Sequence, residues 1–296
     1  MVASGQALES DIMIYSLATQ YSATGYLKSN DQTALFYRYY EVENQKAMVV
    51  LIHGFGEHSG RYAHIIDRLR QERFGVLCID FRGHGLSKGK RGYVKQFQDY
   101  EEDVKAAIKF VQNKQPPQAK IFILAHSMGA LVCLRLMAKM SNTIDGLVLS
   151  SPLFALKLPF PPWKKWAVNM LTRIWPNWPF KSTIHGKDLT SDLTIAKGYD
   201  NDPLVLKSIP VQAIGQLIAA YEGACDIAPV IKHPFFMQIS GIDPVVDPKA
   251  AQEWFRKVNN QDATIKIYPD FLHEIYNENR KKEPIDDFIA WLNKRA

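Results

Sequence analysis

Ser127 lies in a setting that can turn a hydroxyl group into a nucleophile. It follows the apolar run 121–124, which is typical of a buried strand, and it stands between Ala125 and Gly129. A tight strand-to-helix turn projects such a serine above a sheet, and the turn needs small residues two positions before and after it. Glycine is usual at both positions, so Ala125 is a departure, although a methyl group is usually tolerated there. Taken alone, the pentapeptide is also compatible with an ordinary turn.

A serine hydroxyl is a weak nucleophile, so acyl transfer also requires a general base and a carboxylate that orients the base. Asp243 follows the apolar run 235–239, and His273 follows the run 264–268. Both side chains are therefore expected at the carboxyl edge of a sheet. The order serine, aspartate, histidine is the order of the α/β-hydrolase fold. Ser127, Asp243 and His273 are the predicted catalytic triad.

Other carboxylates compete for the role of the acid. Asp243 is also compatible with a simple turn residue, and Asp270 lies in the same loop as His273. Asp247 precedes Pro248 and a helical pattern, which is typical of a helix N-cap. Asp243 is preferred, and His273 is the one histidine of eight that follows the strand nearest the C-terminus.

Acyl transfer also needs donors for the oxyanion that forms on the substrate. Gly54 and Gly56 follow the apolar run 48–52, and glycines there let the backbone present an N–H group to the site. The second donor is expected from the residue after the nucleophile. The predicted donors are the backbone N–H groups of Phe55 and Met128. A glycine turn without a catalytic role would not explain why these glycines occur together with the strand-to-helix turn at Ser127 and with the triad order.

The elements that must position these residues follow an alternating pattern. A hairpin is predicted over residues 21–42, around turn residues 29–31. Strand-like runs then alternate with amphipathic helical patterns, which predicts an α/β fold with a mostly parallel central sheet covered by helices on both faces. The predicted strands cover residues 48–52, 76–79, 121–124, 147–149, 235–239 and 264–268.

The alternation stops at Pro152 and resumes near Pro234. We therefore predict a first part of the core over residues 1–151, an insertion over 152–233, and a second part of the core over 234–296. The insertion is dense in proline, which excludes long uninterrupted helices through much of it. It also holds four of the six tryptophans, Trp163, Trp166, Trp175 and Trp178.

Composition narrows the class of protein. Of 296 residues, 47% are hydrophobic and 22% are charged, which argues against a disordered, collagen-like or disulfide-scaffold protein. The net charge of +6 suits an anionic partner, but no nucleic-acid motif accompanies it, so no nucleic-acid partner is expected. The histidines show no chelating spacing with acids or cysteines, so neither a metal nor a cofactor is expected.

Three features favour a cytoplasmic location. The N-terminal region carries acids where a signal peptide would have basic residues, and no uninterrupted run of eighteen apolar residues occurs. The three cysteines form an odd set without metal-ligand spacing, which fits a reducing compartment. Two of them, Cys78 and Cys133, lie in apolar runs and are expected in the core. The sequence carries no indication of oligomeric state.

Four further stretches, together with the turn around Ser127 (residues 125–130), show a resemblance to a known family. They are residues 53–62 (HGFGEHSGRY) and 80–87 (DFRGHGLS) and, more weakly, 199–204 (YDNDPL) and 241–247 (GIDPVVD). On these stretches the chain resembles the monoacylglycerol lipases and lysophospholipases of the α/β-hydrolase superfamily. The resemblance implies a helical cap formed by the insertion and an acyl ester of glycerol or of a glycerophospholipid as substrate.

The resemblance also implies roles for individual residues. Glu57 and Arg61 are expected to form a polar floor where a glycerol head group would sit, with a structural ion pair as the alternative. Monoacylglycerol lipases often have a second histidine three positions after the catalytic one, where this chain has Tyr276. The head-group preference is therefore open between monoacylglycerols and lysophospholipids.

Aromatic and basic residues alternate near the start of the insertion, from Lys157 to Trp166. Tryptophan and lysine together favour the membrane interface, so a peripheral membrane contact through the insertion is a further expectation. The alternative is that the rings pack the insertion onto the core. Two other functions stay open: an esterase, amidase or aminopeptidase acting on small molecules with the same triad, and a non-catalytic receptor of this fold.

Overall fold

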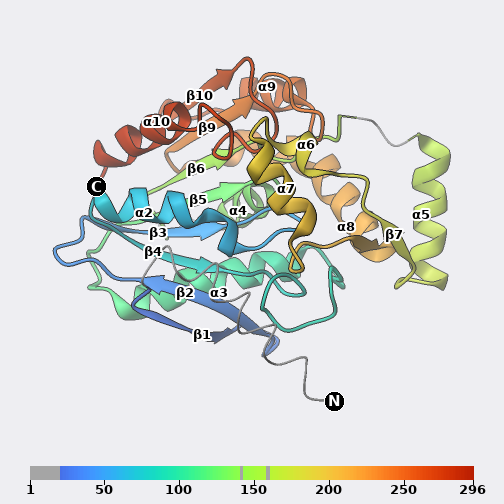
Figure 1. The fold of residues 1–296 in the computed structure, drawn as a ribbon, viewed down its shortest axis with the longest axis horizontal. Helices are drawn as coiled ribbons and strands as arrows, with labels where there is room; N and C mark the ends of the chain where they lie inside the picture. Colours follow the sequence, from blue (N-terminus) through green and yellow to red (C-terminus); the bar gives the residue numbers. More distant parts are fainter. Residues whose placement is uncertain (1–20, 141–142, 158–160) are drawn as a thin grey trace.

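A computed structural model describes residues 21–140, 143–157 and 161–296, and an eight-stranded sheet forms its centre (Figure 1). The strand order is β1-β2-β4-β3-β5-β6-β9-β10. β2 pairs antiparallel with β1 and β4, and every other neighbouring pair is parallel. The predicted mostly parallel sheet is thus confirmed. The strands are β1 (Ala23–Lys28), β2 (Ala34–Tyr40), β3 (Ala47–Ile52), β4 (Phe74–Ile79), β5 (Ile121–His126), β6 (Gly146–Ser150), β9 (Phe235–Ser240) and β10 (Ala263–Tyr268).

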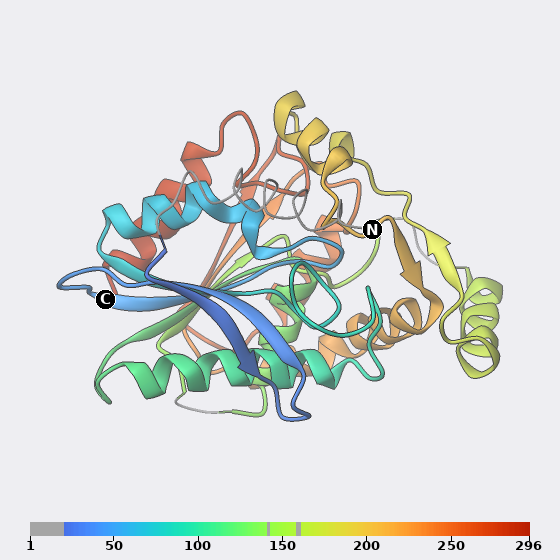
Figure 2. The ribbon, with the colours of Figure 1, turned by 60° about the horizontal axis from the view of Figure 1, so that its bottom comes forward.

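Helices cover both faces of this sheet (Figure 2). Successive side chains of a strand point to opposite faces. In β3, Met48, Val50 and Ile52 accordingly join one buried cluster, whereas Val49 and Leu51 join the other. Both faces are apolar, which explains why the central strands are continuous hydrophobic runs. The first cluster contains residues of α3 (Gln98–Lys114), α4 (Met128–Met137) and α9 (Pro248–Arg256), and the second contains residues of α2 (Ala63–Gln71) and α10 (Lys282–Asn293).

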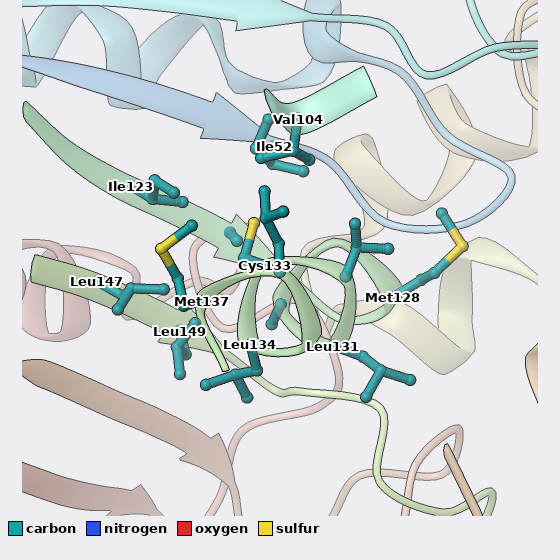
Figure 3. Packing of buried hydrophobic residues seen from close by; sticks show 14 of the residues in the cluster. Ile52, Val104, Ile123, Met128, Leu131, Cys133, Leu134, Met137, Leu147 and Leu149 are labelled. Atoms are coloured by element: carbon teal, nitrogen blue, oxygen red, sulfur yellow. The ribbon is translucent and has the colours of Figure 1, made fainter. Parts of the chain in front are cut away.

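The helix that follows the nucleophile is embedded in the core. Every residue of α4 except Arg135 is buried, and such a helix needs apolar partners on all sides. Figure 3 shows Leu131, Leu134 and Met137 of this helix among side chains of the neighbouring strands and α3. Cys133 of α4 and Cys78 of β4 are buried, as predicted from their apolar runs, and Cys225 is exposed. α4 therefore gives Ser127 a rigid support.

Between β6 and β9, the residues that the structure describes add no strand to the central sheet. In this segment, β7 and β8 instead pair as a separate antiparallel ribbon. α5 packs on α8 and stands at the edge of the molecule, away from the sheet (Figures 1 and 2). The elements are α5 (Pro162–Ile174), β7 (Pro179–Lys181), α6 (Gly186–Leu189), α7 (Leu193–Asn201), β8 (Ser208–Pro210), α8 (Val211–Glu222) and the 3₁₀ helix η2 (Gly223–Val230); a second 3₁₀ helix, η1 (Ser59–Tyr62), precedes α2.

Candidate active site

Ser127 occupies a strained turn between β5 and α4. Its backbone angles are φ 50° and ψ −117°, and a positive φ on a non-glycine residue persists only where the surroundings impose it. The Ser127 N–H donates to the Ser150 carbonyl at 2.9 Å, and the Leu153 N–H donates to the Ser127 carbonyl at 3.2 Å. Gly129 is required beneath the turn, because a Cβ there would lie 2.4 Å from the His53 carbonyl oxygen.

The loops after β9 and β10 bring the other two predicted triad residues to Ser127. The Nε2 atom of His273 lies 3.0 Å from the Ser127 Oγ, and the Nδ1 atom lies 2.7 Å from the Asp243 Oδ2. The second carboxylate oxygen of Asp243 accepts hydrogen bonds from the backbone N–H groups of Val245 (2.8 Å) and Val246 (2.9 Å). All three triad side chains are buried. The arrangement can transfer a proton from a serine to a histidine that a carboxylate orients.

The two other candidate acids, Asp247 and Asp270, have other partners. Asp247 accepts a hydrogen bond from the Lys249 N–H at 3.0 Å and caps α9, as its sequence context predicts. The Asp270 side chain is 80% exposed and lies 3.7 Å from Arg280. Among the described residues, Asp243 is the carboxylate that is hydrogen-bonded to His273.

Burial and charge have opposite effects on the pKa values of His273 and Asp243. Burial favours the neutral imidazole of His273, but the attraction of Asp243 and the hydrogen bond to it outweigh burial, so the pKa of His273 is raised above its ordinary value. Burial also favours the neutral form of Asp243, yet His273 and the backbone donors hold the pKa of Asp243 below its ordinary value. The pair therefore favours an imidazolium next to a carboxylate, which is the state formed when His273 accepts a proton.

The loop after β3 comes close to the nucleophile. A Cβ at Gly54 would lie 3.3 Å from the Ser127 Cβ, and the Gly54 N–H donates to the Glu57 Oε1 at 2.7 Å. Met128 is the first residue of α4, and the first N–H groups of a helix have no partner within it. The role of the backbone N–H groups of Phe55 and Met128 as oxyanion donors stays a prediction.

A buried charged cluster lies behind this loop. Arg61 donates to Glu57 at 2.8 Å and makes two hydrogen bonds to Glu274, at 2.5 and 2.7 Å. Its guanidinium also lies 4.8 Å from the centre of the Tyr199 ring. Burial favours the neutral acid of Glu57, but Arg61, the neighbouring histidines and the hydrogen bond from Tyr62 together outweigh it, and the pKa of Glu57 is lowered to about 2. The structural ion pair is thus present, while contact of Glu57 or Arg61 with a substrate stays a prediction.

The sequence predicted no role for two acidic residues near His273. Glu274 binds Arg61, and Glu278 accepts a hydrogen bond from the Leu272 N–H at 2.8 Å. Their closeness to a candidate base was the one available signal, and it does not distinguish them from surface acids. Among the described residues, no group of three or more His, Cys, Asp or Glu side chains is arranged to hold a metal ion.

The chain is similar to known proteins over most of its length. A family model described as serine aminopeptidase, S33, matches residues 43–280. The human monoglyceride lipase is 30% identical over 281 residues, which covers 93% of this chain and 92% of the relative. A Bacillus subtilis relative named phospholipase YtpA is 27% identical, over 82% of this chain and 94% of the relative.

A solved structure of similar shape is the monoacylglycerol lipase of Paleococcus ferrophilus. Its TM-score is 0.81 at 28% identity, and the match covers 88% of this chain and 99% of that one. The likeness shows the predicted α/β-hydrolase fold. Two further curated relatives are longer: the chain spans 26% of an uncharacterized abhydrolase domain-containing protein of Dictyostelium discoideum and 46% of an uncharacterized protein of Escherichia coli.

Proposed function

The chain belongs to the hydrolase family described as serine aminopeptidase, S33, and we propose that it cleaves carboxylic acyl esters of glycerol or glycerophospholipids through an acyl-enzyme on Ser127. The observation that carries the proposal is the hydrogen-bonded line from Ser127 through His273 to Asp243, at 3.0 and 2.7 Å. The names of the relatives, monoglyceride lipase and phospholipase, support the substrate class.

The reaction proceeds in two steps. The Ser127 Oγ attacks the ester carbonyl while His273 Nε2 takes its proton, and the N–H groups of Phe55 and Met128 stabilise the oxyanion. His273 then gives the proton to the leaving alcohol, which leaves an acyl-enzyme. Water attacks this ester with His273 as base, and the fatty acid and free Ser127 are released. Asp243 stays ionised and holds the imidazole in the required tautomer.

Tyr276 does not provide a head-group contact in this arrangement. Its hydroxyl donates to the Gln238 Oε1 at 2.5 Å, and its ring packs against Phe288 in the core. A head group would therefore be recognised by other residues, and we propose Glu57 and Arg61 for that role.

A substrate panel tests the proposed class. We expect kcat/KM for long-chain monoacylglycerols or lysophospholipids to exceed that for p-nitrophenyl acetate, because the acyl chain contributes apolar burial that a short ester lacks. Fatty acid release would be measured for each substrate and for amino-acid p-nitroanilides. Hydrolysis confined to the anilides would establish the aminopeptidase alternative, and hydrolysis confined to short esters would establish the small-molecule esterase.

We further propose that the insertion caps the site and docks on membranes through α5. Trp163 and Trp166, near the start of α5, are each 66% exposed, and Ile174 and Trp175 at its other end are also exposed. An exposed apolar face rimmed by basic residues suits the interface of an anionic membrane. Within the described residues, no helix is long and apolar enough to cross a bilayer. The exposed and basic residues of this face are Trp163, Lys164, Trp166, Met170, Arg173, Ile174, Trp175, Trp178, Phe180 and Lys181.

Replacing Trp163 and Trp166 together with alanine is expected to lower binding to anionic liposomes and activity on long-chain substrates, because both rings leave the interface. Hydrolysis of a short ester in solution should be unchanged. Co-sedimentation and the two activities are the measurements, and Tyr26→Ala, an exposed aromatic on β1, is the matched control. The docking proposal fails if the wild type does not co-sediment or if both activities fall equally.

A further inference from the structure

The insertion contacts both loops that surround Ser127. Residues 189–191 hydrogen-bond to the loop of His273, and residues 202–206 hydrogen-bond to the loop of the predicted oxyanion donor Phe55. We call the stretch between these contacts, residues 189–206, the bridging segment. It contains α7, which lies closer to the sheet than α5 does (Figures 1 and 2).

The first contact fixes the chain after His273. The Glu274 N–H donates to the Leu189 carbonyl at 2.8 Å. The Thr190 hydroxyl donates to the Asn277 carbonyl at 2.7 Å. These bonds tie the insertion to backbone atoms one and four residues beyond the catalytic base.

Glu278 extends the same contact to the chain before His273. One of its oxygens accepts from the Leu272 N–H at 2.8 Å, and the other accepts from the backbone N–H (3.1 Å) and the hydroxyl of Ser191. Glu278 is 3% exposed, so water does not compete for these bonds. A single buried carboxylate thus joins the residue adjoining His273 to the insertion.

The second contact fixes the oxyanion loop. His58 accepts a hydrogen bond from the Gly60 N–H at Nδ1, so its Nε2 carries the proton and donates to the Asp202 Oδ2 at 2.9 Å. Both side chains are buried, at 0% and 1% exposure. The Leu206 N–H also donates to the carbonyl of Gly56, the residue after Phe55, at 2.8 Å. Asp202 belongs to the stretch 199–204 that the family resemblance singled out.

We propose that the bridging segment is a fixed part of the catalytic apparatus: its Asp202 positions the oxyanion loop, and its Ser191 positions the His273 loop through Glu278. The inference rests on the proposed serine-hydrolase function. Catalysis is sensitive to displacements of about 1 Å between the base, the nucleophile and the oxyanion donors. One segment bonded to both loops sets their separation. A segment that served only as a lid would affect the entry of large substrates and leave the chemistry of a small ester unchanged.

A small ester in solution distinguishes a segment that positions the catalytic loops from one that is only a lid. For p-nitrophenyl butyrate we expect Asp202→Ala and Glu278→Ala each to lower kcat roughly 10- to 100-fold, with KM changed less than about twofold because ground-state contacts are kept. Asp202→Asn and Glu278→Gln keep one acceptor oxygen and should recover part of the loss. An unchanged kcat with a raised KM for long-chain substrates would overturn the proposal.

The matched control is Glu101→Ala. Glu101 is an equally buried carboxylate on α3 that binds Arg135 at 2.9 Å and Lys139 at 2.5 Å. At equal loss of thermal stability it should keep the wild-type kcat, and an equal fall in kcat would overturn the proposal. If the alanine variants do not fold, Ser191→Ala and Asp202→Asn carry the test: each should lower kcat by a smaller factor with KM kept, and an unchanged kcat would overturn the proposal. Ester hydrolysis by the wild type that is lost in Ser127→Ala tests the proposed function separately.

Discussion

Ser127→Ala is expected to abolish ester hydrolysis, with a loss in kcat on the order of 10⁶-fold, because the members of a triad act as a unit. The fold should be kept, since the turn is held by backbone hydrogen bonds to Ser150 and Leu153 that alanine also makes. The measurements are kcat for p-nitrophenyl butyrate and thermal unfolding. Labelling by a fluorophosphonate probe, which reacts with an activated serine, should disappear in parallel.

Ser22→Ala provides the control for this prediction. Ser22 is exposed and accepts a hydrogen bond from the Glu41 N–H, away from the triad. It should keep both activity and labelling. Substantial hydrolysis by Ser127→Ala would remove Ser127 from its role and end the proposed function. A folded wild type that neither hydrolyses esters nor reacts with the probe would favour the non-catalytic receptor.

Asp243→Asn should cost roughly 10⁴-fold in kcat, as loss of the orienting acid does in other triads. Asparagine can still accept the backbone bonds from Val245 and Val246, but its amide group favours the wrong tautomer of His273. Asp247→Asn is the matched variant and should cost little, because asparagine is also a good N-cap. Steady-state kinetics of both variants decide the assignment, and the reverse ranking would move the acid to Asp247.

The pH profile of an Asp243 variant gives a second measurement. His273 must be neutral to accept the serine proton, so activity should rise as pH passes through the pKa of His273. The attraction of Asp243 raises that pKa above its ordinary value, so removing the charge should move the midpoint of the residual activity to lower pH. A midpoint that stays in place in Asp243→Asn would contradict the pairing with His273.

Much of the fold was predictable because its signals are local and repeated. Each predicted strand lies within an observed one, for example residues 121–124 within β5 (Ile121–His126). A sheet buried on both faces requires continuous apolar runs, and these stand out between amphipathic helices. The proximity of Ser127, Asp243 and His273 followed from their order and from their places after predicted strands.

The inner structure of the insertion was not predictable in the same way. Its ribbon of β7 and β8 has three residues in each strand, too few for a periodic signal. The bonds made by Asp202 and Glu278 join residues 144 and 87 positions away in the chain. Single polar contacts over such separations leave no pattern in a sequence, so a buried acid such as Glu278 resembles a surface one until the fold is known.

The placement of the insertion has a consequence for how such enzymes diversify. Two parallel strands such as β6 and β9 need a crossover in any case, and α8 with η2 provides the return path, with η2 packed against α4 and α9. The described residues between β6 and α8 leave this path and form an excursion at the edge of the sheet where the triad lies. Lengthening a loop costs only about 0.6 kcal/mol for each doubling. A lineage can therefore reshape the part of this excursion that lies outside the bridging segment, while the sheet, the triad and the contacts of residues 189–206 stay as they are.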